Sequence, residues 1–180
     1  MKFRNHTITL TVAIAAILLI AAACSSQRTA SDNNSYKDSV KQALEQADLK
    51  DVTVSEDRDK NTITLGGTLH SDDAKQRAED VAKSAASGRI VANEIGVEPV
   101  GMESQAKDIA SNRDDAIEKN YKAAIIEKGL DKEHIRCDAK NGVLTLKGSV
   151  RTPSQRKEAQ QLAQTVPDVQ QVVNKLDVKR

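Results

Sequence analysis

Two copies of one pattern, displaced by 81 positions (148 − 67 = 81), constrain this chain more than any other feature of its sequence. The phrase ITLGGTL at residues 63–69 returns as LTLKGSV at residues 144–150. The same displacement aligns Gly67 with Gly148 and Val97 with Val178, and the alignment between these positions needs no gap. Each copy spans about 60 to 65 residues, which is small but enough to fold alone. The sequence therefore predicts two tandem modules with the same fold.

Each module is predicted to run in the order α-β-β-α-β. Ile117, Tyr121 and Ile125 recur at helical spacing in the second copy, and residues 36–47 of the first copy show the same periodicity. The repeated phrase alternates apolar and polar residues, as a half-buried strand does. Because the single apolar face of such strands must be covered, we expect both helices on one face of a small antiparallel or mixed sheet. The predicted fold class is α+β.

Three kinds of residue have predicted structural roles in this pattern. Gly67 and Gly148 fall inside strands, where a glycine often allows a close approach, and we expect a helix to pack closely on the sheet there. Asn93 and Asn174 lie in register with apolar residues of the last strand, so we expect them to bond backbone groups rather than a ligand. Thr152 begins a Thr-Pro-Ser-Gln capping box, which predicts the start of a helix.

The phrase L-x-G-x-[VL] and the final V-x-N-x-[IL]-x-V, in this order of elements, resemble the BON domain of OsmY-like bacterial envelope proteins. After the first copy, Pro99 and Gly101 break the last strand, and residues 103–112 can be either helical or a loose connector, so we take residues 99–112 as a linker. The resemblance implies a first BON domain at residues 36–98 and a second BON domain at residues 113–180. It implies two helices packed on one face of a small mixed sheet in each domain. It also implies a binding or stress-protection function in the envelope.

The first 35 residues predict export and lipid anchoring. Residues 1–23 combine a basic start with the apolar run ITLTVAIAAILLIAAA, the layout of a signal peptide. The run ends at Cys24 in a segment that resembles a bacterial lipobox, which implies that the Cys24 sulfur carries diacylglycerol and anchors the mature chain. Residues 24–35 predict a disordered tether. Ser25 after the cysteine favours sorting to the outer membrane, on its periplasmic face.

No residue pattern indicates catalysis, a cofactor or a metal. His70 and His134 stand at strand ends without a metal-ligand spacing to a second ligand, so we expect them to face solvent. Cys137 is the only thiol once Cys24 is acylated. It can form an intermolecular disulfide or serve as a small apolar strand residue, and its alternation with Ile135 favours the second role.

Nucleic acid and a small-molecule substrate are also unsupported as partners. The chain has two Tyr, one Phe and no Trp, whereas stacking platforms for single-stranded nucleic acid use several aromatic side chains. Residues 36–98 hold nine basic and thirteen acidic residues, and residues 112–180 hold fourteen and ten. The near-neutral chain therefore contains an acidic and a basic module, although ordinary solvated surfaces would also account for these charges.

The basic module suggests a membrane surface as its partner. Lysines near anionic headgroups are attracted to them. This chain also resembles two-module BON lipoproteins of the outer membrane, and the resemblance implies that it contacts phospholipid through the first helix of the second module. The predicted lipid-binding residues are Lys119, Lys122, Lys128, Tyr121 and Ile126. The predicted function is support of envelope integrity by binding anionic phospholipid, without chemical turnover.

Two alternatives belong to other classes of function. An OsmY-like periplasmic stress-protection chaperone would bind unfolded client proteins. A scaffold would dock a basic partner on the acidic first module.

Overall fold

The structure is a computed structural model and describes residues 35–179, which all belong to one compact unit. The predicted signal peptide, Cys24 and most of the tether lie outside these residues. The first module contains α1 (Tyr36–Gln46), β1 (Thr53–Asp57), β2 (Thr62–Gly66), β3 (Thr68–Leu69), α2 (Asp72–Ala85), β4 (Ile90–Asn93) and β5 (Gly96–Val97). The second contains α3 (Glu103–Glu127), β6 (His134–Lys140), β7 (Val143–Val150), α4 (Pro153–Thr165) and β8 (Gln171–Val178).

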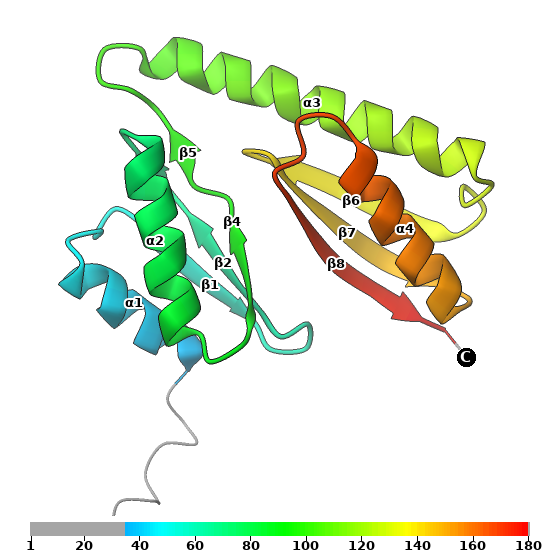
Figure 1. The fold of residues 1–180 in the computed structure, drawn as a ribbon, viewed down its shortest axis with the longest axis horizontal. Coiled ribbons are helices and arrows are strands. Elements are labelled where there is room, and N and C mark those ends of the chain that lie inside the picture. Colours follow the sequence, from blue (N-terminus) through cyan, green and yellow to red (C-terminus); the bar gives the residue numbers. More distant parts are fainter. Residues whose placement is uncertain (1–34, 180) are drawn as a thin grey trace, which may run out of the picture. The chain divides into compact units, whose positions relative to one another are not determined.

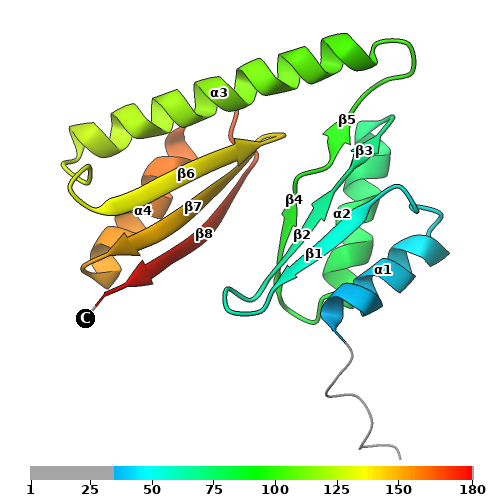
Figure 2. The same cartoon turned by 180° about the vertical axis from the view of Figure 1, so that it is seen from behind.

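Both modules have the predicted mixed sheet. In the first module β2 pairs antiparallel with β1 and parallel with β4, in the order β1-β2-β4. In the second module β7 pairs antiparallel with β6 and parallel with β8, in the order β6-β7-β8. The short strands β3 and β5 continue β2 and β4 as a parallel pair in the first module alone. In both modules the helices cover one face of the sheet (Figures 1 and 2), which confirms the α+β prediction.

Each module has a hydrophobic core of its own between the helices and the sheet. Ile63 and Leu65 of β2 are fully buried in the first core, and Leu144 and Leu146 of β7 are buried in the second. Burying a side chain of this size contributes about 1.5 to 3 kcal/mol. The strand alternation read from the sequence therefore correctly identifies the core face.

Gly67 and Gly148 are required for a different reason from the one predicted. Both adopt positive φ, +99° and +110°. A Cβ atom on Gly67 would collide with the carbonyl oxygen of Asp51, and one on Gly148 with that of His134. The close neighbour is thus the backbone of the adjacent chain segment, so the prediction of close helix packing was wrong.

The predicted polar roles are confirmed. The Asn93 side chain donates to the carbonyl oxygen of Lys75 (3.2 Å) and accepts from the Ile95 N–H (3.4 Å). Its counterpart Asn174 bonds the backbone of α4 and of β8 in the same way. Thr152 forms the expected capping box at the start of α4. The bonds from Ile95 and Leu176 pair main-chain N–H groups beside or in the last strand, and those to Lys75 and Arg156 connect this part of each module to its second helix.

The segment between the modules differs from the predicted linker. Residues 103–112 are helical and continuous with the first helix of the second module, so α3 has 25 residues. Only residues 98–102 connect β5 to it. Across residues 35–179, no helix is both long and apolar enough to cross a membrane.

Candidate functional site: the exposed face of the long helix

The exposed side of α3 carries the charged residues predicted to meet lipid. Ile117, Tyr121 and Ile125 point into the second core and are at most 8% exposed. Lys119, Lys122 and Lys128 are exposed, and so is Ile126, with 62% of its surface accessible. We call these four residues the lysine face. All four are exposed, and Lys119, Lys122 and Ile126 share one side of α3, whereas Lys128 is the C-cap residue that follows the helix.

Tyr121 does not belong to this surface. Its side chain is fully buried, and its hydroxyl donates to the carbonyl oxygen of Ala159 in α4 at 3.3 Å. Burial raises the pKa of this phenol, so it stays protonated and serves as a donor. The prediction that Tyr121 contacts lipid was wrong, because this ring holds the two helices of the module together.

The charges of the lysine face are not equivalent. The Lys122 ammonium lies 2.9 Å from Glu118 Oε2, and the other carboxylate oxygen accepts from the Ala139 N–H at 3.1 Å. The hydrogen bond to Lys122 lowers the pKa of Glu118 and raises that of Lys122. Within residues 35–179, Lys119 and Lys128 form no ion pair. These two residues are therefore the free cations of the surface.

Sequence reasoning missed the apolar residues near the start of α3. Val100, Met102 and Ile109 are exposed by 77%, 55% and 68%. They fall in the predicted linker, where a single exposed apolar residue does not by itself indicate a binding surface. Pro99 and Gly101 interrupt the pattern before the helix, so the sequence does not indicate that these three residues lie beside or on α3.

The modules also contact each other through a small set of residues, here called the module interface. Ala92 of β4 forms a buried cluster with Val143 and Val173 of the second module. The Asn141 amide donates to the carbonyl oxygen of Glu94 at 2.9 Å. The sequence does not distinguish these residues from other alternating strand positions.

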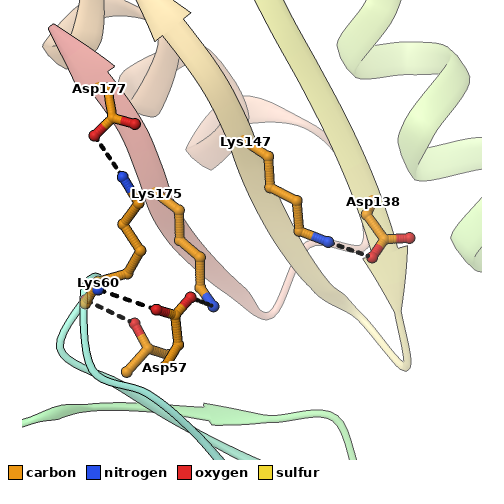
Figure 3. A network of polar contacts seen from close by, with 7 residues as sticks. Asp57, Lys60, Asp138, Lys147, Lys175 and Asp177 are labelled. Carbon is orange, nitrogen blue, oxygen red and sulfur yellow. Dashed lines mark hydrogen bonds and ion pairs between the residues drawn. The ribbon is translucent and has the colours of Figure 1, made fainter.

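Ion pairs link the modules beside this cluster. The Lys175 ammonium lies 3.0 Å from Asp57 Oδ2, and Lys60 pairs with Asp177 (Figure 3). The hydrogen bond from Lys175 lowers the pKa of Asp57. These ion pairs therefore use part of the charge difference between the modules. The scaffold alternative had assigned the acidic charge of the first module to a separate basic partner.

The remaining predicted positions show no sign of a metal centre. His70 and His134 are exposed, and no group of three metal-ligating side chains occurs within residues 35–179. Cys137 is half-buried on the core side of β6, next to Ile135 and Ala139. Burial raises the pKa of its thiol, which suits the predicted role as an apolar strand residue.

Comparisons with known proteins agree with the repeat. The BON domain profile matches residues 32–99 and 113–180. Osmotically-inducible protein Y of Escherichia coli (strain K12) is 27% identical over 150 residues, which cover 82% of this chain and 73% of that protein. A solved structure of the C-terminal domain of CdsD, described as the structural protein of the type III secretion system of Chlamydia trachomatis, is 13% identical. The match covers 77% of our chain and 62% of the CdsD chain. Its TM-score of 0.32 is too low to show a shared fold.

Proposed function

This chain belongs to the BON domain family through both of its modules, and from that premise we propose that it is a non-catalytic envelope protein that contacts anionic phospholipid through the lysine face. Its similarity to osmotically-inducible protein Y supports a role in envelope or osmotic stress. We place the protein at the periplasmic side of the outer membrane, held there by acylation of Cys24.

The observation that carries this proposal is the pairing state of the lysines. Lys119 extends a free charge from the same side of α3 as Ile126, which exposes 62% of its surface, and Lys128 adds a second free charge at the C-cap. A headgroup phosphate attracts the ammonium groups, while an isoleucine beside them can enter the boundary between headgroups and acyl chains. Each lysine close to an anionic surface contributes about 1 kcal/mol. Lys122 contributes less, because Glu118 already neutralises it.

Anchoring makes such a weak surface sufficient. Two lysines supply only about 2 kcal/mol, so a protein without the anchor binds a membrane weakly and needs a high lipid concentration. A chain tethered by acyl groups remains within reach of the bilayer, so the second contact forms at a high effective concentration. Cys24→Ser should release the protein from the membrane fraction or leave an unprocessed precursor. Metabolic labelling that detects no acyl chain on the wild-type protein would contradict this part of the proposal.

Flotation with phospholipid vesicles tests the lysine face itself. The chain beginning at Ser25, which lacks the anchor, should float with vesicles that contain phosphatidylglycerol and remain behind with purely zwitterionic vesicles. The double variant Lys119→Gln and Lys128→Gln should lose roughly thirtyfold in affinity, the equivalent of about 2 kcal/mol. Binding should also weaken as the salt concentration rises, because the Debye length falls from about 8 Å at physiological ionic strength.

The matched control is a second pair of lysines in the same module. Lys157 and Lys179 are exposed and form no ion pair among the described residues, so Lys157→Gln with Lys179→Gln removes the same net charge elsewhere. An equal loss of binding in both double variants would mean that net charge, not the lysine face, attracts the vesicles. Binding that is indifferent to salt and to both pairs would favour the alternative of client-protein binding.

A further inference from the structure

The outer edge of β4 presents main-chain groups to the second module. The N–H groups of Ile90 and Glu94 bond the carbonyl oxygens of Asn61 and Leu65 on the side of β2. Since successive residues of a strand direct their main-chain groups to opposite sides, those of Val91 and Asn93 face away from the sheet. β4 is the last strand of its sheet, so these groups have no strand partner.

A single side chain takes the place of that strand. The Gln171 amide nitrogen donates to the Val91 carbonyl oxygen at 2.6 Å, and its amide oxygen accepts from the Asn93 N–H at 3.1 Å. In a parallel sheet, the N–H group of a residue bonds the carbonyl oxygen of the residue before its partner. Its carbonyl oxygen accepts from the N–H group of the residue after that partner. The Gln171 amide thus makes the two bonds that a parallel strand residue opposite Ala92 would make.

We propose that the β4 edge is a binding site for an extended polypeptide segment, which adds as a parallel strand when Gln171 leaves. A primary amide has the same donor and acceptor as a peptide group, so the resident side chain identifies the ligand chemistry. Addition of a strand to a free sheet edge is an established mode of peptide recognition. This inference concerns a different surface and a different ligand from the lysine face, and does not depend on lipid binding.

The module interface, which covers the β4 edge, is small and polar enough to open. Its apolar part consists of Ala92, Val143 and Val173. Its ion pairs include Lys175 with Asp57, and partly exposed pairs contribute about 0 to 1 kcal/mol each. Small polar contacts between domains permit relative motion. A segment that supplies a row of main-chain bonds can therefore compete with one glutamine.

The surroundings of the edge provide access and favour a basic ligand. A polar cleft of about 430 Å³ is lined by Asn93 and Gln171 together with two acidic side chains, Asp72 and Glu79, and two lysines, Lys75 and Lys83, so the cleft itself is neutral. Glu94 follows directly at the end of β4 and loses its partner Lys140 when the modules separate, and the module as a whole holds thirteen acidic and nine basic residues over residues 36–98. We therefore expect an extended segment with lysine or arginine beside its apolar residues.

Two measurements on the full chain test this proposal. The affinity is measured with a short fluorescent peptide of alternating threonine and valine flanked by lysine, and the exchange of main-chain amides is followed by nuclear magnetic resonance. Gln171→Ala should bind the peptide about tenfold more tightly than the wild-type protein, the equivalent of about 1.4 kcal/mol. In this variant the Asn93 amide should exchange rapidly with solvent when alone and become protected when the peptide is added. Gln161→Ala, an exposed position on α4, should behave as the wild type.

Two further arms keep the test decisive. Lys175→Gln weakens the module interface without touching the edge, so it should also increase peptide binding if Gln171→Ala proves too unstable to study. A peptide of the same sequence with alternate backbone N-methyl groups should not bind. Equal binding of the methylated peptide, no protection of Asn93 at saturation, or protection that appears without peptide in a dimer of the chain would each overturn the proposal.

Discussion

Replacing Gly148 by alanine tests the claim that a neighbouring backbone, not a helix, requires glycine in the repeated phrase. At φ +110° an L-residue is strained, and a strained position of this kind costs about 1 to 3 kcal/mol. The added Cβ also collides with the carbonyl oxygen of His134, which must move with β6. Overpacking of a rigid site costs about 1 to 3 kcal/mol more. We expect a total loss of about 2 to 6 kcal/mol in the second module.

Gly129 provides the matched control. It also has positive φ, +69°, but a Cβ atom there would meet nothing within 4 Å. Gly129→Ala should therefore cost only the conformational part, about 1 to 2 kcal/mol. The difference between the two variants isolates the collision with His134.

Tyrosine fluorescence during urea unfolding measures these costs in the correct module. The chain has two tyrosines, Tyr36 in α1 and Tyr121 in the second core. In a Tyr36→Phe background, Tyr121 reports the second module alone. If Gly148→Ala and Gly129→Ala unfold with the same free energy, within about 0.5 kcal/mol, the steric argument fails. A parallel loss in the first module, followed in a Tyr121→Phe background, would show that the modules unfold together.

Two other predictions concern titratable groups. Because the hydrogen bond from Lys175 lowers the pKa of Asp57, the pair stabilises the module interface above the unfolded pKa of about 3.9 and is lost as the pH falls through the lower folded value. The amide shift of Asn93 should therefore change on acidification to about pH 3, and Lys175→Gln should show the weakened contact already at neutral pH. Burial raises the pKa of Cys137, so its alkylation by iodoacetamide near neutral pH should be much slower in the folded protein than in urea; equal rates would contradict its packed position.

The sequence predicted most of the fold because each module repeats a complete set of local signals. Strand alternation placed Leu144 and Leu146 in the core, and the capping box at Thr152 marked the start of α4. The extension of α3 to Glu103 was left open between a helix and a loose connector, because the only apolar residues at 103–112 are Ala106, Ile109 and Ala110, and Ile109 is exposed rather than packed.

The candidate site was harder to predict than the fold. A helical stripe contains both core and surface residues, and Tyr121 was assigned to both roles until its burial decided between them. The i,i+4 spacing of Glu118 and Lys122 on a helix does indicate their ion pair, but no local pattern predicts the main-chain bond from Ala139 of β6 to Glu118. The contact of Gln171 with β4 joins residues about 80 positions apart, and no local pattern predicts such a contact.

The module interface joins equivalent positions of the two copies. Ala92 and Val173 are 81 positions apart (173 − 92 = 81) and lie in the same buried cluster. Glu94 and Lys175 are also 81 positions apart (175 − 94 = 81), and each forms an ion pair with the other module. The contact thus has the character of a two-fold dimer interface contained within one polypeptide.

The equivalent positions Glu94 and Lys175 carry opposite charges, and this determines which modules can associate. Glu94 pairs with Lys140, while Lys175 pairs with Asp57. Two first modules associating in the same manner would bring Glu94 toward the carboxylates around Asp57, and two second modules would bring Lys175 toward Lys140. Like charges held close together repel. A module paired with a second copy of itself would therefore lose these ion pairs, whereas the two different modules of one chain form both of them.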